Sequence, residues 1–393
     1  MKKLQKSKIV LASLFIAGIA ISLYIRIVFF PYYSGDSHDS LIPWYDFMVE
    51  HGFFRSLSQN FYNYNPPYIY LIGLTTFFTW IPKLTAIKII SVIFDFVAAA
   101  AAYHIVFFKR QDQQWAWLAF FTVLFAPTVF IESGFWGQCD VIYTAFLLWM
   151  IYFLLREHYF KALIFFSLAF VFKSQAIFLA PLILFLFIKR KLPFYSLLIP
   201  ITIYLLSILP AWLAGRSFMD LLGIYFSQVG TYNSLSMNAP NLFFLFSGKA
   251  YYSVTGVFAG LIIAALFVVG YLIIRVNKTA STNVDFYFYD ACFLAFFIPF
   301  LLPKMHDRYF FPAALFFLII AFFDKKALWL GVSLQISTLL SFLGFLYNLP
   351  FNSTAISFVI NIVLMVFIFR WYLKKIRSQA PQTISTNTLA KNS

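Results

Sequence analysis

Long runs of apolar residues recur along almost the whole chain and are separated by short polar segments. Such a run must form a helix if it crosses about 30 Å of hydrocarbon, because lipid offers no partner for backbone amides and carbonyls. We therefore predict twelve membrane helices, at 9–30, 85–108, 115–132, 140–155, 161–172, 176–188, 192–214, 251–274, 285–302, 310–323, 327–347 and 355–371.

Two of these helices come from one apolar stretch, 161–188, that is too long for a single crossing. Its middle contains Lys173-Ser174-Gln175, and Pro181 follows. Because a proline removes a helical hydrogen bond and polar residues are costly in lipid, we interpret the stretch as two short helices that meet at this turn.

The apolar segment 66–82 is short for a crossing and begins with two prolines. If it does not cross, the basic clusters between the other helices all fall on one side, which then holds 20 of the 29 Lys and Arg residues. Cytoplasmic loops are rich in these residues. We therefore predict a re-entrant or juxtamembrane helix here, twelve crossings, and both termini in the cytoplasm.

The composition agrees with an integral membrane protein, in the plasma membrane if the source is bacterial. The chain is 62% hydrophobic and only 11% charged, whereas soluble domains carry about 25% charged residues. Soluble enzymes are thereby excluded. The net charge of +15 follows mostly from topology and does not indicate nucleic acid. We predict one transmembrane domain over 1–373 and a disordered cytoplasmic tail over 374–393.

On the external side, this topology places two long loops, 31–84 and 215–250, and most of the polar clusters of the sequence. Residues 40–51 are expected to form an aromatic-rich interfacial helix in the first loop. A transporter would gather such polar groups near the midplane of the membrane. Their position at one surface favours an enzyme that acts on a lipid-borne substrate.

The first loop contains Asp36 and Asp39, just beyond the first predicted helix. A carboxylate there could accept a proton from an attacking hydroxyl. Either residue could instead cap the following helix, since Asp is favoured at that position. Both interpretations stay open at this point.

Cationic residues on the external side are candidates to bind a phosphate. Lys173 lies in the break between two helices, where it is costly without an anion. Lys304, His306 and Arg308 lie together at one predicted helix end, and Arg and Lys bind phosphate well. Snorkelling of Lys304 and Arg308 to the interface is the alternative.

The turn Trp136-Gly137-Gln138-Cys139-Asp140 offers groups that suit a sugar. Gln138 and Asp140 could bind sugar hydroxyls, and Trp136 could stack on a pyranose ring. A tight glycine turn with an interfacial tryptophan is the alternative. Inside the second predicted helix, Asp95 is expected to pair with Lys88 or with Arg26.

No sequence motif indicates a nucleotide, a metal or another cofactor. Walker-type loops, GxSxG and Cys/His metal-ligand spacings do not occur in the sequence. A glycosyl donor would therefore have to be a lipid carrier. Asp36, His38 and Asp39 do not form a convincing set of metal ligands, so we expect no metal.

Six motifs in order resemble the GT-C superfamily of membrane glycosyltransferases, and in particular the group related to the second mannosyltransferase of GPI-anchor synthesis. They cover about residues 30–312 and comprise Ser34-Gly35-Asp36 with Pro43-Trp44-Tyr45, Asn65-Pro66-Pro67-Tyr68, Trp136-Gly137-Gln138-x-Asp140, Phe172-Lys173-Ser174-Gln175, Asn238-Ala239-Pro240-Asn241 and Met305-His306-Asp307-Arg308-Tyr309. The last motif more often has Glu where this chain has Asp307.

The resemblance implies an all-α polytopic fold of GT-C type, with a base in the first external loop. By position that base is Asp36, with Asp39 as a rival. The donor phosphate would bind Lys173, His306, Arg308 and Lys304. Sugar or acceptor contacts are expected from Trp136, Gln138, Asp140, Trp44, Tyr64, Gln175, Asn238 and Asn241.

The predicted activity is inverting transfer of a hexose, with mannose as the expected sugar. The donor is a polyprenyl-phosphate-linked sugar, and the acceptor is a hydroxyl on a lipid or glycan at the external membrane face. A flippase of lipid-linked saccharides is the alternative from another class. A third possibility, a non-catalytic partner subunit, would tolerate loss of Asp36, His306 and Arg308 together.

Overall fold

The computed structural model describes residues 2–230, 233–247, 252–277, 283–347 and 352–378. The described chain is an all-α polytopic membrane protein, as predicted. Its main elements are α1 (Lys2–Phe29), η1 (Ser37–Leu41), α2 (Ile42–His51), α3 (Phe53–Ser56), α4 (Pro66–Thr75), α5 (Lys83–Arg110), α6 (Gln113–Phe125), α7 (Pro127–Phe130), η2 (Ile131–Trp136), α8 (Asp140–Leu155), α9 (Tyr159–Phe172), η3 (Ser174–Leu179), α10 (Ala180–Ile188), α11 (Leu198–Leu213), α12 (Phe218–Gly230), β1 (Ser236–Met237), α13 (Val254–Asn277), α14 (Phe286–Leu301), β2 (Met305–His306), α15 (Phe311–Ile320), α16 (Leu328–Leu346) and α17 (Asn352–Ser378).

Every predicted span coincides with a helix, but the helices differ in length. Within the described ranges, six helices are long and apolar enough to cross a membrane, or seven if one bent pair is a single span. The five remaining predicted spans are shorter apolar helices, namely α8, α9, α10, α14 and α15. The stretch 161–188 divides at Lys173, as predicted, into α9 and the pair η3 and α10.

The structure differs from the prediction at span 115–132, which is not one straight helix. It consists of α6 and then α7 with η2, with a bend of 45° between the two parts. The break falls at Ala126, whose backbone is extended (ψ 124°), directly before Pro127. Proline lacks an N–H and disfavours helical backbone in the residue before it. The bend carries η2 into the site described below.

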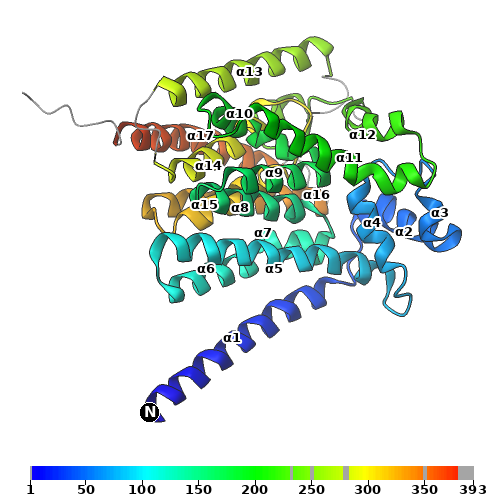
Figure 1. Cartoon of the computed structure of the whole chain (residues 1–393), viewed down its shortest axis with the longest axis horizontal. Coiled ribbons are helices and arrows are strands. Elements are labelled where there is room, and N and C mark those ends of the chain that lie inside the picture. The colour runs from blue at the N-terminus through cyan, green and yellow to red at the C-terminus, as the bar shows by residue number, and fades with distance from the viewer. Residues whose placement is uncertain (1, 231–232, 248–251, 278–282, 348–351, 379–393) are drawn as a thin grey trace, which may run out of the picture.

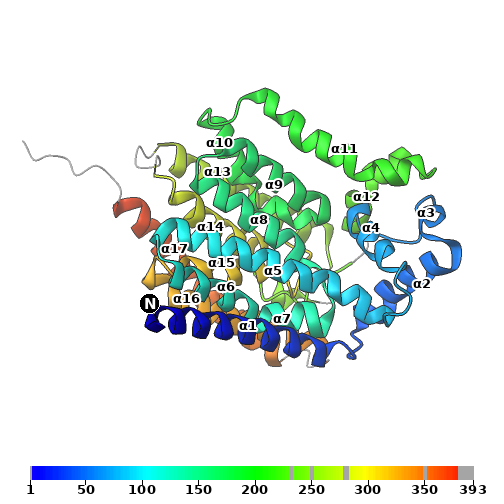
Figure 2. The same cartoon turned by 60° about the horizontal axis from the view of Figure 1, so that its bottom comes forward.

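The first predicted external loop contains a group of short helices. α2, α3 and α4 lie at one end of the helix bundle, beside α12 and the end of α11 (Figures 1 and 2). α4 ends at Thr75 after ten residues, which is too short for a crossing. The interfacial helix predicted over 40–51 corresponds closely to α2. The second predicted loop contains α12, a helix that the apolar pattern did not indicate.

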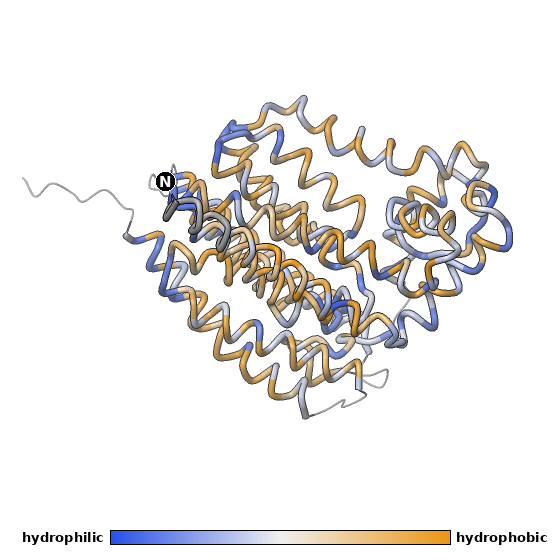
Figure 3. The backbone as a smooth tube through the Cα atoms, turned by 90° about the horizontal axis from the view of Figure 1, so that it is seen from below, coloured by the Kyte–Doolittle hydropathy of each residue, from blue (hydrophilic) through white to orange (hydrophobic). Residues whose placement is uncertain are grey.

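The two ends of the described chain both lie at the opposite end of the bundle from α2 to α4, well apart from each other (Figure 1). α17 continues to Ser378, so the predicted disordered tail begins at least five residues too early. Its remaining part, 379–393, lies outside the described residues. Hydrophobic residues follow the lengths of the helices, and hydrophilic ones gather chiefly near their ends (Figure 3).

The core is built from α5, α8, α14 and α15, whose side chains are mostly buried. α1 and α13 lie at the periphery and expose large apolar side chains, as helices in contact with lipid do. α1 is anchored by one buried ion pair, between Arg26 Nε and Asp95 Oδ2 at 2.7 Å. This confirms the predicted structural pairing of Asp95, with Arg26 rather than Lys88 as its partner.

Candidate active site

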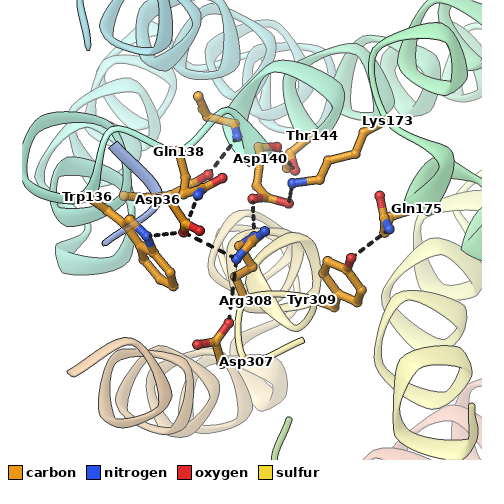
Figure 4. A network of polar contacts seen from close by, with 12 residues as sticks. Asp36, Trp136, Gln138, Asp140, Thr144, Lys173, Gln175, Asp307, Arg308 and Tyr309 are labelled. Carbon is orange, nitrogen blue, oxygen red and sulfur yellow. Dashed lines mark hydrogen bonds and ion pairs between the residues drawn. The ribbon is translucent and has the colours of Figure 1, made fainter. Parts of the chain in front are cut away.

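Four charged side chains from distant parts of the chain meet near the end of the bundle that carries α2 to α4. Asp36 precedes η1, Asp140 begins α8, Lys173 lies between α9 and η3, and Arg308 follows β2. Figure 4 shows the four side chains pointing toward one another. All four are candidate site residues from the sequence, and the fold brings them into one network.

Asp36 is fixed through one of its two carboxylate oxygens. Its Oδ2 accepts hydrogen bonds from Trp136 Nε1 at 2.8 Å and from Gln138 Nε2 at 2.5 Å. Arg308 Nη1 lies 3.8 Å from the same oxygen. The side chain is 31% exposed, and Oδ1 has no hydrogen-bond donor among the described residues. One oxygen therefore sets the orientation of the carboxylate, and the other is available to a substrate.

The structure does not support a helix-capping role for Asp36. Its side chain makes no capping hydrogen bond at the start of η1. Ser34 serves instead, because its Oγ accepts a hydrogen bond from the Ser37 amide at 3.1 Å. Ser34 Oγ also donates to the Trp136 carbonyl at 2.7 Å. The Ser-Gly-Asp motif thus joins the first loop to η2 and leaves the Asp36 side chain for other contacts.

Asp39, the rival base, lies outside this network. Its side chain is 76% exposed, and its Oδ1 is 2.8 Å from Nδ1 of the exposed His38. Such a pair is strongly screened by water and contributes little. The described contacts of Asp39 therefore place it apart from Lys173 and Arg308.

Asp140 is completely buried and joins the two cations of the network. Its Oδ1 lies 2.6 Å from Lys173 Nζ, and its Oδ2 lies 3.2 Å from Arg308 Nε. Burial alone would lower the pKa of Lys173, but Asp140 outweighs this effect and the pKa is raised. Both cations therefore stay charged, and Asp140 serves them rather than a sugar hydroxyl, which differs from the sequence-based expectation.

The turn that carries Arg308 contains two further titratable groups. Burial, Arg308 and Lys173 all hold the pKa of His306 well below its usual value, so its imidazole is neutral near pH 7. Asp307 is buried, and neither of its oxygens has a hydrogen-bond partner among the described residues. Burial, opposed by Arg308, raises the pKa of Asp307 to about 7.

β1 and β2 form a short parallel pair that ties the second long loop to this turn. Met237 pairs with His306, and Asn238 forms a bridge to His306. Asn238 thus contacts the site through its backbone. The Lys304 amide donates to the Leu235 carbonyl at 2.7 Å, and its ammonium lies 5.1 Å from the centre of the Tyr252 ring.

Trp136 has a different role from the one predicted. The indole is fully buried, stacks on Phe345 at 4.9 Å between ring centres and meets the edge of Phe342 at 5.1 Å. Arg308 lies 5.5 Å from its ring centre. A buried ring has no open face on which a pyranose could stack. The structure therefore does not support the predicted stacking of a sugar on Trp136. Trp136 instead positions Asp36 through its N–H and packs beside Arg308.

Three other predicted contact residues surround the network. Tyr64 lies below Lys173, whose ammonium is 5.9 Å from its ring centre, and Trp44 meets Tyr64 edge-on at 5.2 Å. Gln175 Nε2 donates to the Tyr309 hydroxyl at 2.8 Å. These side chains form an aromatic and polar wall beside the charged groups, as would suit a sugar.

Asn241, which was expected to contact the sugar or the acceptor, instead makes contacts within the protein. It is fully buried, and its amide donates to the carbonyls of Pro299 and Leu302 at 3.2 and 2.9 Å. Its Oδ1 accepts from the Phe243 amide at 3.1 Å. Asn241 therefore fastens the second loop to the end of α14, and the hydrogen bonds of its side chain all go to backbone groups.

Some residues that hold the backbone around the site were not predicted as site residues from the sequence. Lys88 Nζ contacts four backbone carbonyls, those of Phe29, Phe30, Tyr32 and Phe135. It thereby joins the end of α1 to η2. A basic residue inside an apolar span was a visible signal, since such residues are costly without partners, but nothing in the sequence shows that the partners are carbonyls.

Glu132 and Asn65 act in the same way. The Glu132 carbonyl accepts from the amides of Gly137 and Gln138, and its Oε1 accepts from the Val141 amide at 3.2 Å. Asn65 Nδ2 donates to the Val171 carbonyl at 2.6 Å, two residues before Lys173. These bonds set the backbone that presents Gln138, Asp140 and Lys173.

The arrangement favours binding of an anion next to a carboxylate base. Asp36 and Asp140 both face the Arg308 guanidinium, and no three His, Cys, Asp or Glu side chains in the described part of the chain could together hold a metal ion. That metal is not needed stays a prediction.

The comparisons with known proteins concern the fold. No family profile and no curated sequence matches this chain. The solved structures include ArnT from Cupriavidus metallidurans in the apo state, with a TM-score of 0.54 and 12% sequence identity. The match covers 93% of this chain and 78% of ArnT. At this identity the likeness shows the fold alone, an all-α polytopic membrane fold that this chain shares with ArnT.

Proposed function

We propose that the protein is an inverting glycosyltransferase that uses a polyprenyl-phosphate-linked hexose. The observation that carries the proposal is the hydrogen bonding of the Asp36 carboxylate. Its Oδ2 accepts two hydrogen bonds, its Oδ1 accepts none from the described residues, and the side chain lies beside the network of Lys173, Asp140 and Arg308. A base and a phosphate-binding pair are the two elements that this transfer requires. The fold shared with ArnT is consistent with such an enzyme.

In the proposed reaction, the acceptor hydroxyl gives its proton to Asp36 Oδ1 while its oxygen attacks the anomeric carbon. The bond from that carbon to the phosphate oxygen breaks, and polyprenyl phosphate leaves with the electron pair. Arg308 and Lys173 stabilise the charge that develops on the phosphate. Because the leaving group is a weak base, no strong general acid is needed.

The contact between Arg308 and Asp36 gives this arrangement a way to accept the phosphate. At 3.8 Å it is longer than the contacts of Asp140 with Lys173 and Arg308. Arg308 Nη1 can therefore turn toward a phosphate oxygen while its Nε stays at Asp140.

An apolar groove supports a lipid-borne donor. It lies at the bend between α6 and α7, and its lining includes Phe125, Pro127, Val332 and Ile336. η2 begins four residues after Pro127 and ends at Trp136, so the chain that lines the groove continues into the residue that holds Asp36. An isoprenoid chain would bind there mainly by buried area, at roughly 25 cal/mol per Å².

The proposal includes two further points: the transferred sugar is mannose, and the active site lies on the external face of the membrane. They rest on the resemblance to the mannosyltransferase group and on the distribution of basic residues. Accessibility to a membrane-impermeant thiol reagent, for a single cysteine placed at exposed Asp39, tests the side of the membrane. Labelling from outside intact cells is expected, and labelling only after permeabilisation would contradict the external assignment.

The activity is tested with purified protein in liposomes and radiolabelled polyprenyl-phosphate-mannose. Membrane extract from the source cells supplies acceptors, and polyprenyl-phosphate-glucose and GDP-mannose serve as controls. We expect label to move from the mannosyl lipid to an acceptor, and no transfer from GDP-mannose. Transbilayer movement of the lipid without any transfer would instead support a flippase.

A further inference from the structure

A second buried cation lies outside the network around Asp36. Arg216 is in the turn between α11 and α12 and is 5% exposed. Its Nη2 donates to Asn60 Oδ1 at 2.7 Å, and its guanidinium lies 4.2 Å from the centre of the Tyr62 ring. Its Nε and Nη1 are buried and have no hydrogen-bond partner among the described residues.

The other buried arginines show that this is unusual. Four arginines are buried in the described part of the chain. Arg26 pairs with Asp95 at 2.7 Å, and Arg275 pairs with Asp290 at 2.9 Å. Arg308 lies 3.8 Å from Asp36 and 3.2 Å from Asp140. Arg216 forms no ion pair with any described residue.

A guanidinium keeps its charge in proteins and carries five N–H donors. Burying such a charge without an anion costs several kcal/mol. The stacked Tyr62 ring and the single bond to Asn60 hold the side chain in place but supply no negative charge. The two unused donors, Nε and Nη1, lie on different edges of the guanidinium, and each can give one charge-assisted hydrogen bond to a phosphoryl oxygen. The site therefore lacks one component, an anion.

The backbone is built to present this side chain. Gly215 has a φ of +109°, which a residue with a side chain rarely adopts. The Arg216 amide donates to the Ala211 carbonyl at 3.1 Å, which closes the end of α11. Leu213 and Met219, three residues to either side of Arg216, are exposed apolar side chains. A buried cation within an apolar rim suits a phosphoryl group carried by a lipid.

The site is connected to the Asp36 network by one short segment. Asn60 contacts Arg216, and Tyr64, four residues later, lies below Lys173. Four residues of extended chain span at most about 14 Å. One lipid-linked acceptor could thus place its phosphoryl group at Arg216 and a sugar hydroxyl at Asp36.

We propose that Arg216, with Asn60 and Tyr62, binds a phosphoryl group of a lipid-linked acceptor, at a site separate from the donor phosphate. That the ligand is an acceptor rests on the proposed glycosyltransferase function. Binding of the phosphoryl group itself does not. The group belongs either to a lipid head group or to a free phosphate ester, and the experiment separates these sources.

Binding is measured on the full-length protein, purified in dodecyl maltoside and stripped of lipid. The apparent Kd comes from the shift of Tm on titration with dihexanoyl phosphatidic acid, or with inorganic phosphate. The variants are Arg216→Gln and, as a matched control, Arg55→Gln, which removes an exposed arginine of the first loop, five residues before Asn60. Arg216→Lys keeps the charge and serves if the glutamine variant does not fold.

We expect saturable stabilisation of the wild type and of Arg55→Gln. Arg216→Gln should weaken the apparent Kd by about tenfold or more, because charge-assisted hydrogen bonds are lost, and Arg216→Lys should fall between. Saturation by phosphatidic acid alone indicates a lipid head group, and saturation by both ligands indicates that a phosphoryl group suffices. Equal Kd values in the wild type and both Arg216 variants, or no saturable binding, would overturn the site.

The titration needs no glycosyl transfer, so the two proposals fail separately. If the liposome assay shows no transfer but Arg216 still governs phosphoryl binding, the glycosyltransferase assignment fails and the anion site stands. If transfer occurs and Arg216→Gln leaves both the titration and the KM for acceptor unchanged, the anion site fails alone.

Discussion

Replacing Asp140 with Asn tests the energetics of the charged network most clearly. Asp140 is completely buried and is the shared counter-ion of Lys173 and Arg308, at 2.6 and 3.2 Å. The substitution keeps the shape of the side chain and removes its charge. It leaves two buried cations. Arg308 keeps Asp36 at 3.8 Å and Asp307 at 3.9 Å, whereas Lys173 keeps no carboxylate within 4 Å among the described residues.

The expected cost follows from burial. Breaking a buried ion pair by removing one partner destabilises a protein by about 3–5 kcal/mol, because the remaining charge is uncompensated. The matched control is Asp46→Asn. Asp46 pairs with Lys83 at a similar distance, 2.7 Å, but the two side chains are 50% and 42% exposed. Exposed pairs contribute about 0.2–1 kcal/mol, so the control should change little.

The assay is the free energy of unfolding in mixed micelles at pH 7 for the wild type, both single variants, Lys173→Met and the double variant Asp140→Asn/Lys173→Met. Because Lys173→Met removes the cation that Asp140→Asn leaves unpaired, the double variant should be more stable than the sum of the single effects predicts, by about 1–3 kcal/mol. The account is refuted if Asp140→Asn costs no more than Asp46→Asn, or if the two changes at Asp140 and Lys173 are additive.

The remaining predictions concern three other parts of the site. Burial raises the pKa of Asp307 from 3.8 to about 7. Between these two pH values the folded protein holds a proton that the unfolded chain releases, so the free energy of unfolding should fall as pH rises from about 4 to about 7. Asp307→Asn should remove this loss, so that unfolding measured at pH 5 and pH 8 differs less than in the wild type, and an equal pH dependence would contradict the assignment. Lys88→Met should destabilise the protein by at least about 1–3 kcal/mol, because buried carbonyls lose their donor, whereas unchanged unfolding would show that the four contacts are dispensable. Trp136→Phe keeps the packing but removes the N–H to Asp36, so it should lower the rate of transfer with little effect on stability, and an unchanged rate would refute a positioning role.

Much of the fold could be predicted from the sequence because lipid permits few solutions. An apolar run must become a helix, so each predicted span coincides with one. The break at Lys173 was also predictable, since a polar turn inside an apolar stretch is costly unless the helix ends there. The bend at Pro127 was missed although the proline was visible, because the apolar run continues through it.

The charged members of the site were easier to find than the rest. Lys173 and Arg308 stood out because the predicted topology places them on the side that is poor in basic residues. The roles of Trp136 and Asn241 were wrong, because whether a polar side chain faces a ligand or fastens a neighbouring segment depends on burial. Lys88 was considered only as a partner of Asp95, since its true partners are backbone carbonyls, which leave no mark on the sequence. The site at Arg216 could not be predicted either. That this buried arginine forms no ion pair with a described residue becomes visible only when its neighbours in the fold are known.

The central claim is that Asp36 is the base, and the rate of transfer in Asp36→Asn tests it most directly. The comparison is with Asp39→Asn, an equally conservative change three residues away on an exposed side chain. Loss of a general base costs typically 10²–10⁴-fold in rate. We expect a loss of about this size for Asp36→Asn, with normal unfolding, and near wild-type transfer for Asp39→Asn. Full transfer by Asp36→Asn, or the loss appearing in Asp39→Asn instead, would contradict the account.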